Sequence, residues 1–354
     1  MKFSDIFTSA SLAANWTEAA SNGIPYLGAG LFPAKKKVGL DLKWIKGNKG
    51  LPVSLAPSNF DAKSTLRSRE GFKVDETEMA FFRESMLIKE RDEQDMQRVE
   101  GANDPYALEI MRRVYDDQRT LIDAANVVPE RMIMQLLAPT NSGAPGITIA
   151  ANGVQYTYNY DVGGDYATAH YEALTSTKKW DAPSTANPIG DLQTAQDAVE
   201  EITGSRPTRV IMSKATLGKM MACDSVKDAI LAQNPTANII MTPAIVNSVV
   251  QSLLGLTILV YNKKVKDEAG NVVQLYPDGY VTLIPDGALG NTWYGSTPEE
   301  RMLNGKIADV SIVNTGVAVC VSQTVDPVNT KTTVSEIVLP SYERMDETYV
   351  IKAY

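Results

Sequence analysis

The sequence of 354 residues contains one histidine and two cysteines, and this scarcity limits the chemistry that the chain can carry. His170 has no second histidine and no nearby cysteine, so a histidine-based metal site or a Ser-His-Asp triad is hard to assemble around it. We expect His170 to be a solvated loop residue. Cys223 and Cys320 lie in apolar runs and cannot make a disulfide framework, which indicates two buried free thiols.

Long apolar segments are scarce as well. The longest run, LLGLTILVY at residues 253–261, is too short for a membrane-spanning helix. The first sixteen residues contain an early aspartate and no continuous apolar core, which excludes a secretory signal. We therefore expect a soluble protein that is made in the cytoplasm and has no membrane contact.

Motifs that hold phosphates or cations are incomplete. GAG at 28–30 lacks the third glycine and the strand–helix context of a dinucleotide site, and VGGD at 162–165 lacks the GK[ST] of a phosphate loop. Asp75, Glu76 and Glu78 lack the fixed spacing of a calcium loop. We expect turns at the two glycine motifs, and neither a metal nor a cofactor.

Glu299 and Glu300 are the remaining candidates for acid–base catalysis. They follow Thr297 and Pro298, which suit the cap and the first position of a helix. Acids are favoured at this positive end of the helix dipole, so a local role explains both carboxylates. The sequence therefore predicts no active site, and we expect a protein that is not an enzyme.

The charge balance argues against a dedicated nucleic-acid binder, because the net charge is −8 and the sequence pI is near 5.0. The charges are also unevenly distributed. Residues 34–73 hold ten Lys or Arg against three acids, whereas residues 74–104 hold ten acids against four bases. These two halves could pair within the chain or between copies, or they could form a solvated surface with a chance excess of each sign.

The first part of the chain shows no compact core of its own. Residues 1–50 combine a helical opening with a strand pattern at VGLDLKWIKG, as in an arm that packs on a partner surface. Leu51–Leu87 is long, polar and weakly periodic. Ordering each backbone residue costs about 1–2 kcal/mol, so such an excursion indicates a functional loop.

The rest of the chain has clearer periodicity. A long helix is predicted over 104–137, and Pro129 is expected to kink or restart it. Asn152-Gly153 predicts the turn of a β-hairpin. Residues 190–315 indicate a separate α/β unit, with helices predicted at Asp191–Ile202, Lys214–Cys223 and Thr242–Leu254.

Several stretches carry a family resemblance. TLRSREGFKVDETEMAFFRESM places a basic R-S-R-x-G in the polar segment, and the long helix DPYALEIMRRVYDDQRTLIDAANVVPERMIMQLL follows it. KKWDAPSTANPIGDLQTAQDAV combines a tryptophan, prolines and an Asp-rich helix start. GALGNTWYG and LPSYERMDETYVIKAY come later. In this order, the stretches resemble the major capsid proteins of tailed bacteriophages, in the lambda-like (phage capsid E) family.

The resemblance implies an α+β fold, the Hong Kong 97-type phage capsid fold. Its expected parts are an N-terminal arm (1–50), an extended loop formed by a long β-hairpin (51–88), a peripheral domain (89–189) with a spine helix at about 104–137, an α/β axial domain (190–315), and a return to the peripheral domain (316–354).

The same resemblance implies a virion protein whose copies form pentamers and hexamers of an icosahedral shell around double-stranded DNA, which it contacts non-specifically. A separate scaffolding protein, a portal and a decoration protein are the implied partners. Some relatives use a lysine–asparagine cross-link, for which Lys63 or Lys73 would be available. We expect no cross-link here, because neither the partner asparagine nor an acidic promoter is identifiable.

Contact residues between subunits follow from the charge pattern. The basic tip of the loop is expected to rest on an acidic surface of an adjacent subunit. The basic candidates are Lys63, Arg67, Arg69 and Lys73. The acidic candidates are Asp92, Glu93, Asp95, Glu109, Asp116 and Asp117.

Two rival functions remain open at this point. One is an encapsulin-like nanocompartment shell, which has the same fold and encloses a cargo protein instead of DNA. The other is an enzyme whose α/β unit at 190–315 is catalytic and whose basic segment binds a phosphorylated substrate.

Overall fold

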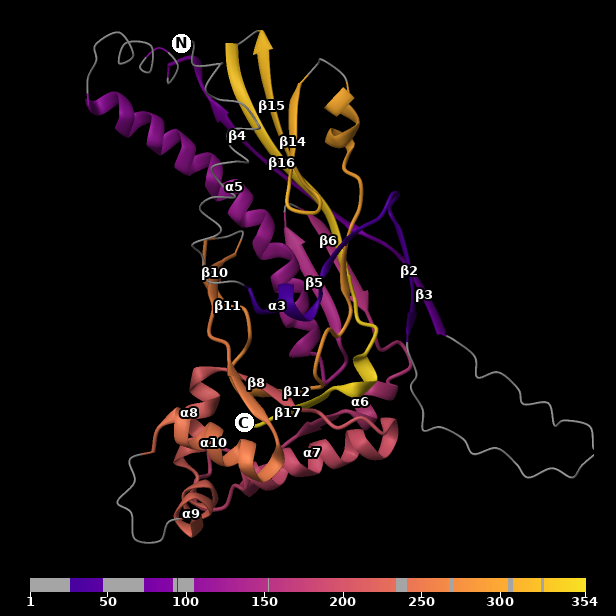
Figure 1. The fold of residues 1–354 in the computed structure, drawn as a ribbon. Helices are drawn as coiled ribbons and strands as arrows, with labels where there is room; N and C mark the ends of the chain where they lie inside the picture. Colours follow the sequence, from indigo (N-terminus) through magenta and orange to yellow (C-terminus); the bar gives the residue numbers. More distant parts are fainter. Residues whose placement is uncertain are drawn as a thin grey trace, which may run out of the picture. The chain divides into compact units, whose positions relative to one another are not determined.

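The computed structural model describes residues 26–46, 73–91, 94, 105–151, 153–233, 241–267, 270–304, 308–325 and 328–354 (Figure 1). The chain divides into two compact units. Unit 1 comprises Met1–Lys43, Glu76–Met132 and Asn291–Ser341, and unit 2 comprises Trp44–Asp75, Ile133–Gly290 and Tyr342–Tyr354. Each unit is therefore built from segments that are distant in the sequence.

A six-stranded sheet forms the centre of unit 1. Its strand order is β1 (Ala34–Lys36), β13 (Asn291–Tyr294), β16 (Val328–Ser341), β15 (Val317–Val325) and β14 (Asp309–Val313), and β4 (Ala80–Ile88) also pairs with β16. Only the pairing of β1 with β13 is parallel in this sheet. The 14-residue strand β16 pairs with three others, so it is the strand on which the sheet is assembled.

Helices complete unit 1. They are α3 (Leu27–Leu31), α5 (Pro105–Leu137), whose last residues belong to unit 2, and the 3-10 helix η2 (Pro298–Asn304). The long helix predicted at 104–137 is confirmed from Pro105 onward. It continues through Pro129, so the expected restart is wrong. The buried side chains of Ile122, Ala125 and Met132 hold this part of the helix by packing.

Two short strands flank the polar segment. β2 (Asp41–Lys46) pairs with β3 (Lys73–Glu78) in a two-stranded sheet. The strand expected in VGLDLKWIKG is therefore confirmed, although it begins later than the alternation suggested. Residues 47–72, which separate the two strands, lie outside the described residues.

Unit 2 is an α/β unit. Its sheet has the strand order β7 (Tyr171–Ala173), β17 (Tyr349–Lys352), β12 (Tyr280–Ile284), β8 (Arg209–Met212) and β9 (Thr257–Val260). Its helices are α6 (Asp165–Ala169), α7 (Pro188–Thr203), α8 (Lys214–Ala222), α9 (Asp224–Gln233) and α10 (Pro243–Leu254), with short 3-10 turns η1 (Ser176–Lys178) and η3 (Met345–Glu347). Hairpins are formed by β5 (Gly146–Ala151) with β6 (Val154–Asn159) and by β10 (Lys264–Lys266) with β11 (Val272–Gln274).

Capping residues and prolines in the sequence predicted where these helices begin. The Asn187 side chain accepts a hydrogen bond from the amide of Gly190 at 3.2 Å, so α7 begins at Pro188, just before the predicted start. Thr242 caps α10 in the same way. The helices predicted at Lys214 and Thr242 are confirmed, and so is the hairpin turn, where Gly153 has a φ of 79°.

Buried side chains of α7–α10 and the sheet form the core of unit 2. Trp180 is fully buried there and donates its indole N–H to Asp191 at 2.9 Å. Burial raises the pKa of Asp191, although the bond from Trp180 opposes the change. Cys223 belongs to this core, and both cysteines are buried and free, as the sequence predicted.

His170 does not lie in a solvated loop, and that expectation is wrong. The side chain is buried and stacks on Tyr166, with ring centroids 5.2 Å apart. Its carbonyl oxygen accepts a hydrogen bond from the amide of Val350 in β17. Pairing with the C-terminal strand β17 therefore holds this histidine in the interior. No residue near His170 in the sequence indicates that it would pair with β17.

Candidate functional site

The predicted contact residues fall mostly on segments without described side chains. Lys63, Arg67, Arg69, Asp92, Glu93 and Asp95 lie outside the described residues. Lys73 is the first residue of β3. Glu109, Asp116 and Asp117 lie in α5. No described contact joins a basic candidate to an acidic one, so the docking of the loop stays a prediction.

A cluster of charged side chains in unit 1 joins η2 to three strands. Glu300 accepts a hydrogen bond from the ammonium group of Lys36 in β1 at 2.7 Å. The buried Glu299 accepts one from the hydroxyl of Ser335 in β16 at 2.6 Å, and it forms an ion pair with Arg83 in β4. The two carboxylates therefore hold η2 against the sheet. Their role as helix-start acids is only part of what they do.

The expected cap at Thr297 is wrong. Its hydroxyl is buried and has no hydrogen-bond partner in the described part of the chain. Instead, Glu300 reaches back and accepts from the amide of Thr297 at 3.5 Å. The helix start is thus satisfied by the reciprocal half of a capping box.

Glu336 is a second unusual carboxyl group in unit 1. Side chains alternate along a strand, so Glu336 points to the face of β16 opposite Ser335. It is 1% exposed, and neither oxygen has a hydrogen-bond partner among the described residues. Burial raises the pKa of Glu336 well above the usual glutamate range. Burial also raises the pKa of Tyr294, and the charge of Glu336 adds to this.

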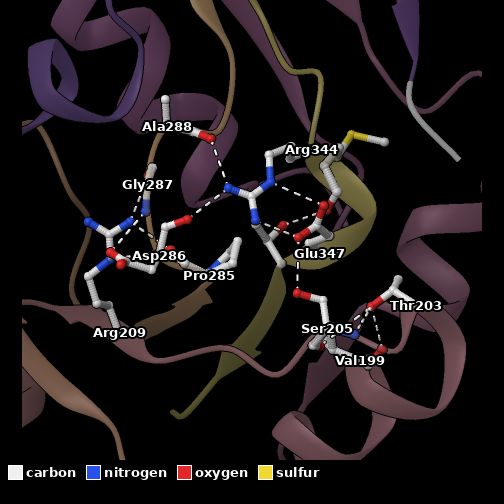
Figure 2. A network of polar contacts seen from close by, with 12 residues as sticks. Val199, Thr203, Ser205, Arg209, Pro285, Asp286, Gly287, Ala288, Arg344 and Glu347 are labelled. Atoms are coloured by element: carbon white, nitrogen blue, oxygen red, sulfur yellow. Dashed lines mark hydrogen bonds and ion pairs between the residues drawn. The ribbon is translucent and has the colours of Figure 1, made fainter. Parts of the chain in front are cut away.

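A polar network in unit 2 is centred on Arg344 (Figure 2). Its guanidinium donates two parallel hydrogen bonds to Glu347, at 3.1 and 2.6 Å. It also donates to the carbonyl oxygens of Asp286 at 2.8 Å and Ala288 at 3.1 Å. Because the bonds to Glu347 stabilise the charged guanidinium, they raise the pKa of Arg344.

Arg209 holds the same turn from the other side, as Figure 2 shows. Its guanidinium donates to the carbonyl oxygens of Pro285 and Gly287, at 2.6 and 2.7 Å. The two arginines therefore satisfy four successive carbonyl groups of one turn. Bidentate guanidinium contacts of this kind fix a backbone geometry that lysine could not fix.

The Arg344 network lies where the chain leaves and re-enters unit 2. Gly290 is the last residue of unit 2 before the excursion through unit 1, and Tyr342 is the first after it. The amide of Arg344 donates to the carbonyl of Leu289 at 2.8 Å, and Ser205 donates to Glu347 at 3.0 Å. The network thus holds the outgoing and incoming segments together. The R-x-x-E spacing was its only signal in the sequence.

Chemical sites are not evident in the described ranges. No three His, Cys, Asp or Glu side chains there lie close enough together to hold a metal ion. No helix in the same ranges is long and apolar enough to cross a membrane. The polar groups that the structure does bring together all join segments of the fold.

Comparisons with known proteins bear on the whole chain. A family model described as phage major capsid protein E matches residues 8–348. The comparison with curated proteins found no match.

Two solved structures are similar over nearly their full lengths. A phage-related protein of Bordetella bronchiseptica RB50 is 14% identical, with a TM-score of 0.56 over 98% of this chain and 97% of its own. A structure described as a prophage capsid protein of E. coli CFT073 is 13% identical, with a TM-score of 0.57 over 98% and 99%. At these identities the likeness shows a common fold.

Proposed function

The chain belongs to the phage major capsid protein E family, and from this premise we propose the form in which it acts. It is a shell-forming structural protein of a bacteriophage. In our proposal, copies form pentamers and hexamers of an icosahedral shell that encloses double-stranded DNA in the virion. The observation that carries the proposal is the span of the family match, residues 8–348 of 354. In this role the chain has no catalytic activity.

The division into arm, extended loop, peripheral domain and axial domain is part of the proposal. The predicted mixed α and β capsid fold is confirmed by the likeness to solved structures. An axial domain at 190–315 is supported by the sheet of unit 2, since β8, β9, β12 and the helices α8–α10 lie within that range and α7 begins two residues before it. Residues 291–315 of the range belong to unit 1. α5 is the proposed spine helix, and its 33-residue length supports this.

The extended loop is proposed to lie over a neighbouring subunit. The pairing of β2 with β3 supports this, because the segment 47–72 runs between two strands that pair with each other. The segment is also basic within a chain of net charge −8. Its docking on an acidic surface of the neighbour follows from that contrast of charge.

Partners outside the chain complete the proposal. A separate scaffolding protein, a portal and a decoration protein would act on the assembled subunits. Packaged DNA would be contacted non-specifically, because a net charge of −8 argues against a dedicated nucleic-acid binder.

Sedimentation velocity and negative-stain microscopy of the purified protein test the proposal. The protein should form capsomer-sized rings or closed shells, with a co-expressed scaffolding protein where one is required. Obligate interfaces of roughly 2,000–5,000 Å² would stabilise these assemblies. A stable monomer under all conditions, with the scaffolding protein included, would contradict it.

A further inference from the structure

The hairpin of β10 and β11 carries an exposed face of mixed chemistry. Lys264 pairs with Gln274 and Lys266 with Val272 in the antiparallel register. Residues opposite each other in such a pair point to the same face. Lys264, Lys266 and Val272 therefore share one face, which we call the hairpin face. Val272 is 66% exposed on it.

Gln274, opposite Lys264 on this face, donates to the carbonyl oxygen of Tyr276 at 2.8 Å and to Asp278 at 3.0 Å, whereas nothing in the described part of the chain covers Val272. The hairpin forms a sheet of only two strands, and such a pair is marginally stable in water unless it packs against something else. Among the described residues, neither Lys264 nor Lys266 forms an ion pair. A surface that covers the hairpin face should therefore be apolar and acidic.

The last turn of α7 has this chemistry. It holds Glu200, Glu201 and Ile202 and no basic residue, and Ile202 is 43% exposed. Glu200 pairs with Arg206, whereas no described residue pairs with Glu201. An acid is unfavourable at the negative end of a helix dipole, so Glu201 would gain from a cation brought by a partner.

The two surfaces lie at opposite ends of the same pair of parallel strands. Arg209 of β8 is in register with Thr257 of β9, and Met212 is in register with Val260. The segment that follows α7 reaches the Arg209 end of β8. There the carbonyl oxygen of Thr208 accepts a hydrogen bond from the amide of Thr257. The hairpin follows the Val260 end, and Figure 1 shows it rising near α8, away from α7.

Because the surfaces lie at opposite ends of these strands, they do not meet within one copy. We propose that the hairpin face of one copy docks on the last turn of α7 of a second copy. Lys264 and Lys266 then pair with Glu201, and Val272 packs on Ile202. Such a contact uses two different patches and is heterologous, so repetition forms a ring where the rotation between copies closes, as in the proposed capsomer. The inference rests on the proposed shell function and names the surface that joins neighbours within a capsomer.

A charge swap tests the pairing. Lys264→Glu with Lys266→Glu should lower the yield of rings and shells at least about tenfold, because acids then face Glu201. Glu201→Lys alone should also lower it. Combining the three changes should restore assembly. As a matched control, Lys214→Glu with Lys219→Glu changes two exposed lysines of α8 and should assemble normally.

Engineered disulfides test the contact directly, even in unclosed assemblies. A concentrated mixture of Val272→Cys and Ile202→Cys proteins should form a covalent heterodimer under mild oxidation. The native cysteines are buried and should not compete. A mixture of Val162→Cys and Ile202→Cys proteins is the control, since Val162 is exposed but lies off the hairpin.

The outcomes separate the docking from the shell function. Normal assembly of the hairpin double variant, or no heterodimer above the control, overturns the docking. Heterodimers between the two cysteine variants, together with a wild-type protein that never forms rings or shells, would support the docking and overturn the proposed function. Circular dichroism melts of every variant show whether it is folded, and the triple variant guards against a simple folding defect.

Discussion

The buried carboxyl group of Glu336 makes the stability of unit 1 depend on pH. In the folded subunit this group keeps its proton at pH values where an exposed glutamate has lost it, because burial raises its pKa. The folded state therefore binds more protons than the unfolded state between the two pKa values. Stability is fully present below the unfolded pKa of about 4.3 and falls as the pH rises toward the folded pKa.

Two substitutions separate the cost of ionising Glu336 from the cost of burying its oxygens without hydrogen bonds. Glu336→Gln removes the titration and keeps a buried polar group, so it should match the wild type at pH 4. Its advantage should then grow by up to about 1.4 kcal/mol for each pH unit above the unfolded pKa, until the buried group ionises. Glu336→Met also removes the unsatisfied oxygens. It should add about 1–3 kcal/mol at every pH.

Urea or thermal unfolding of unassembled subunits, followed by circular dichroism at pH 4, 6 and 8, measures both effects. Each kcal/mol corresponds to about 2–4 °C for domains of 150–250 residues. Glu84→Gln is the control, since Glu84 is an exposed residue of β4 in the same sheet. Equal pH dependence in the wild type and Glu336→Gln, or a less stable glutamine variant at pH 8, would refute the reasoning.

Three further predictions concern other parts of the chain. Arg344→Ala leaves the buried Glu347 without its guanidinium and should lower the free energy of unfolding by about 3 kcal/mol; an unchanged urea midpoint would argue against the role of the network. Trp180→Ala opens a cavity in the core of unit 2 and should lower it by about 3–5 kcal/mol in the same assay. Arg67→Glu with Arg69→Glu should leave the melting temperature nearly unchanged and block shell closure, whereas normal particle counts by microscopy would rule out the docking of the basic loop.

Local signals explain which parts of the fold were predictable. The cap and proline at Thr242-Pro243 and the Asn152-Gly153 turn are short-range features, and the structure has a helix and a hairpin there. The long helix was visible as a pattern over many turns. The helix does not restart at Pro129, because packing over a long buried face outweighs the loss of one backbone hydrogen bond.

The polar clusters could not be predicted, because their members are distant in the sequence. Arg83 and Glu299 meet only because β4 and η2 both lie against β16. His170 is buried by a strand that starts at Tyr349. Glu336 is a charged residue on the same face of β16 as Val334 and Val338, and that face is covered. Tertiary pairing, which sequence patterns do not specify, decides each of these cases.

Closure of many copies of this chain into a shell is the central proposal. A cryo-electron microscopy reconstruction of the assembled particles tests it most directly. We expect closed icosahedral shells with rings of five and six copies, in which a basic loop segment lies on the adjacent subunit. Particles without closed symmetry, or a protein that stays monomeric with its scaffolding protein present, would contradict it.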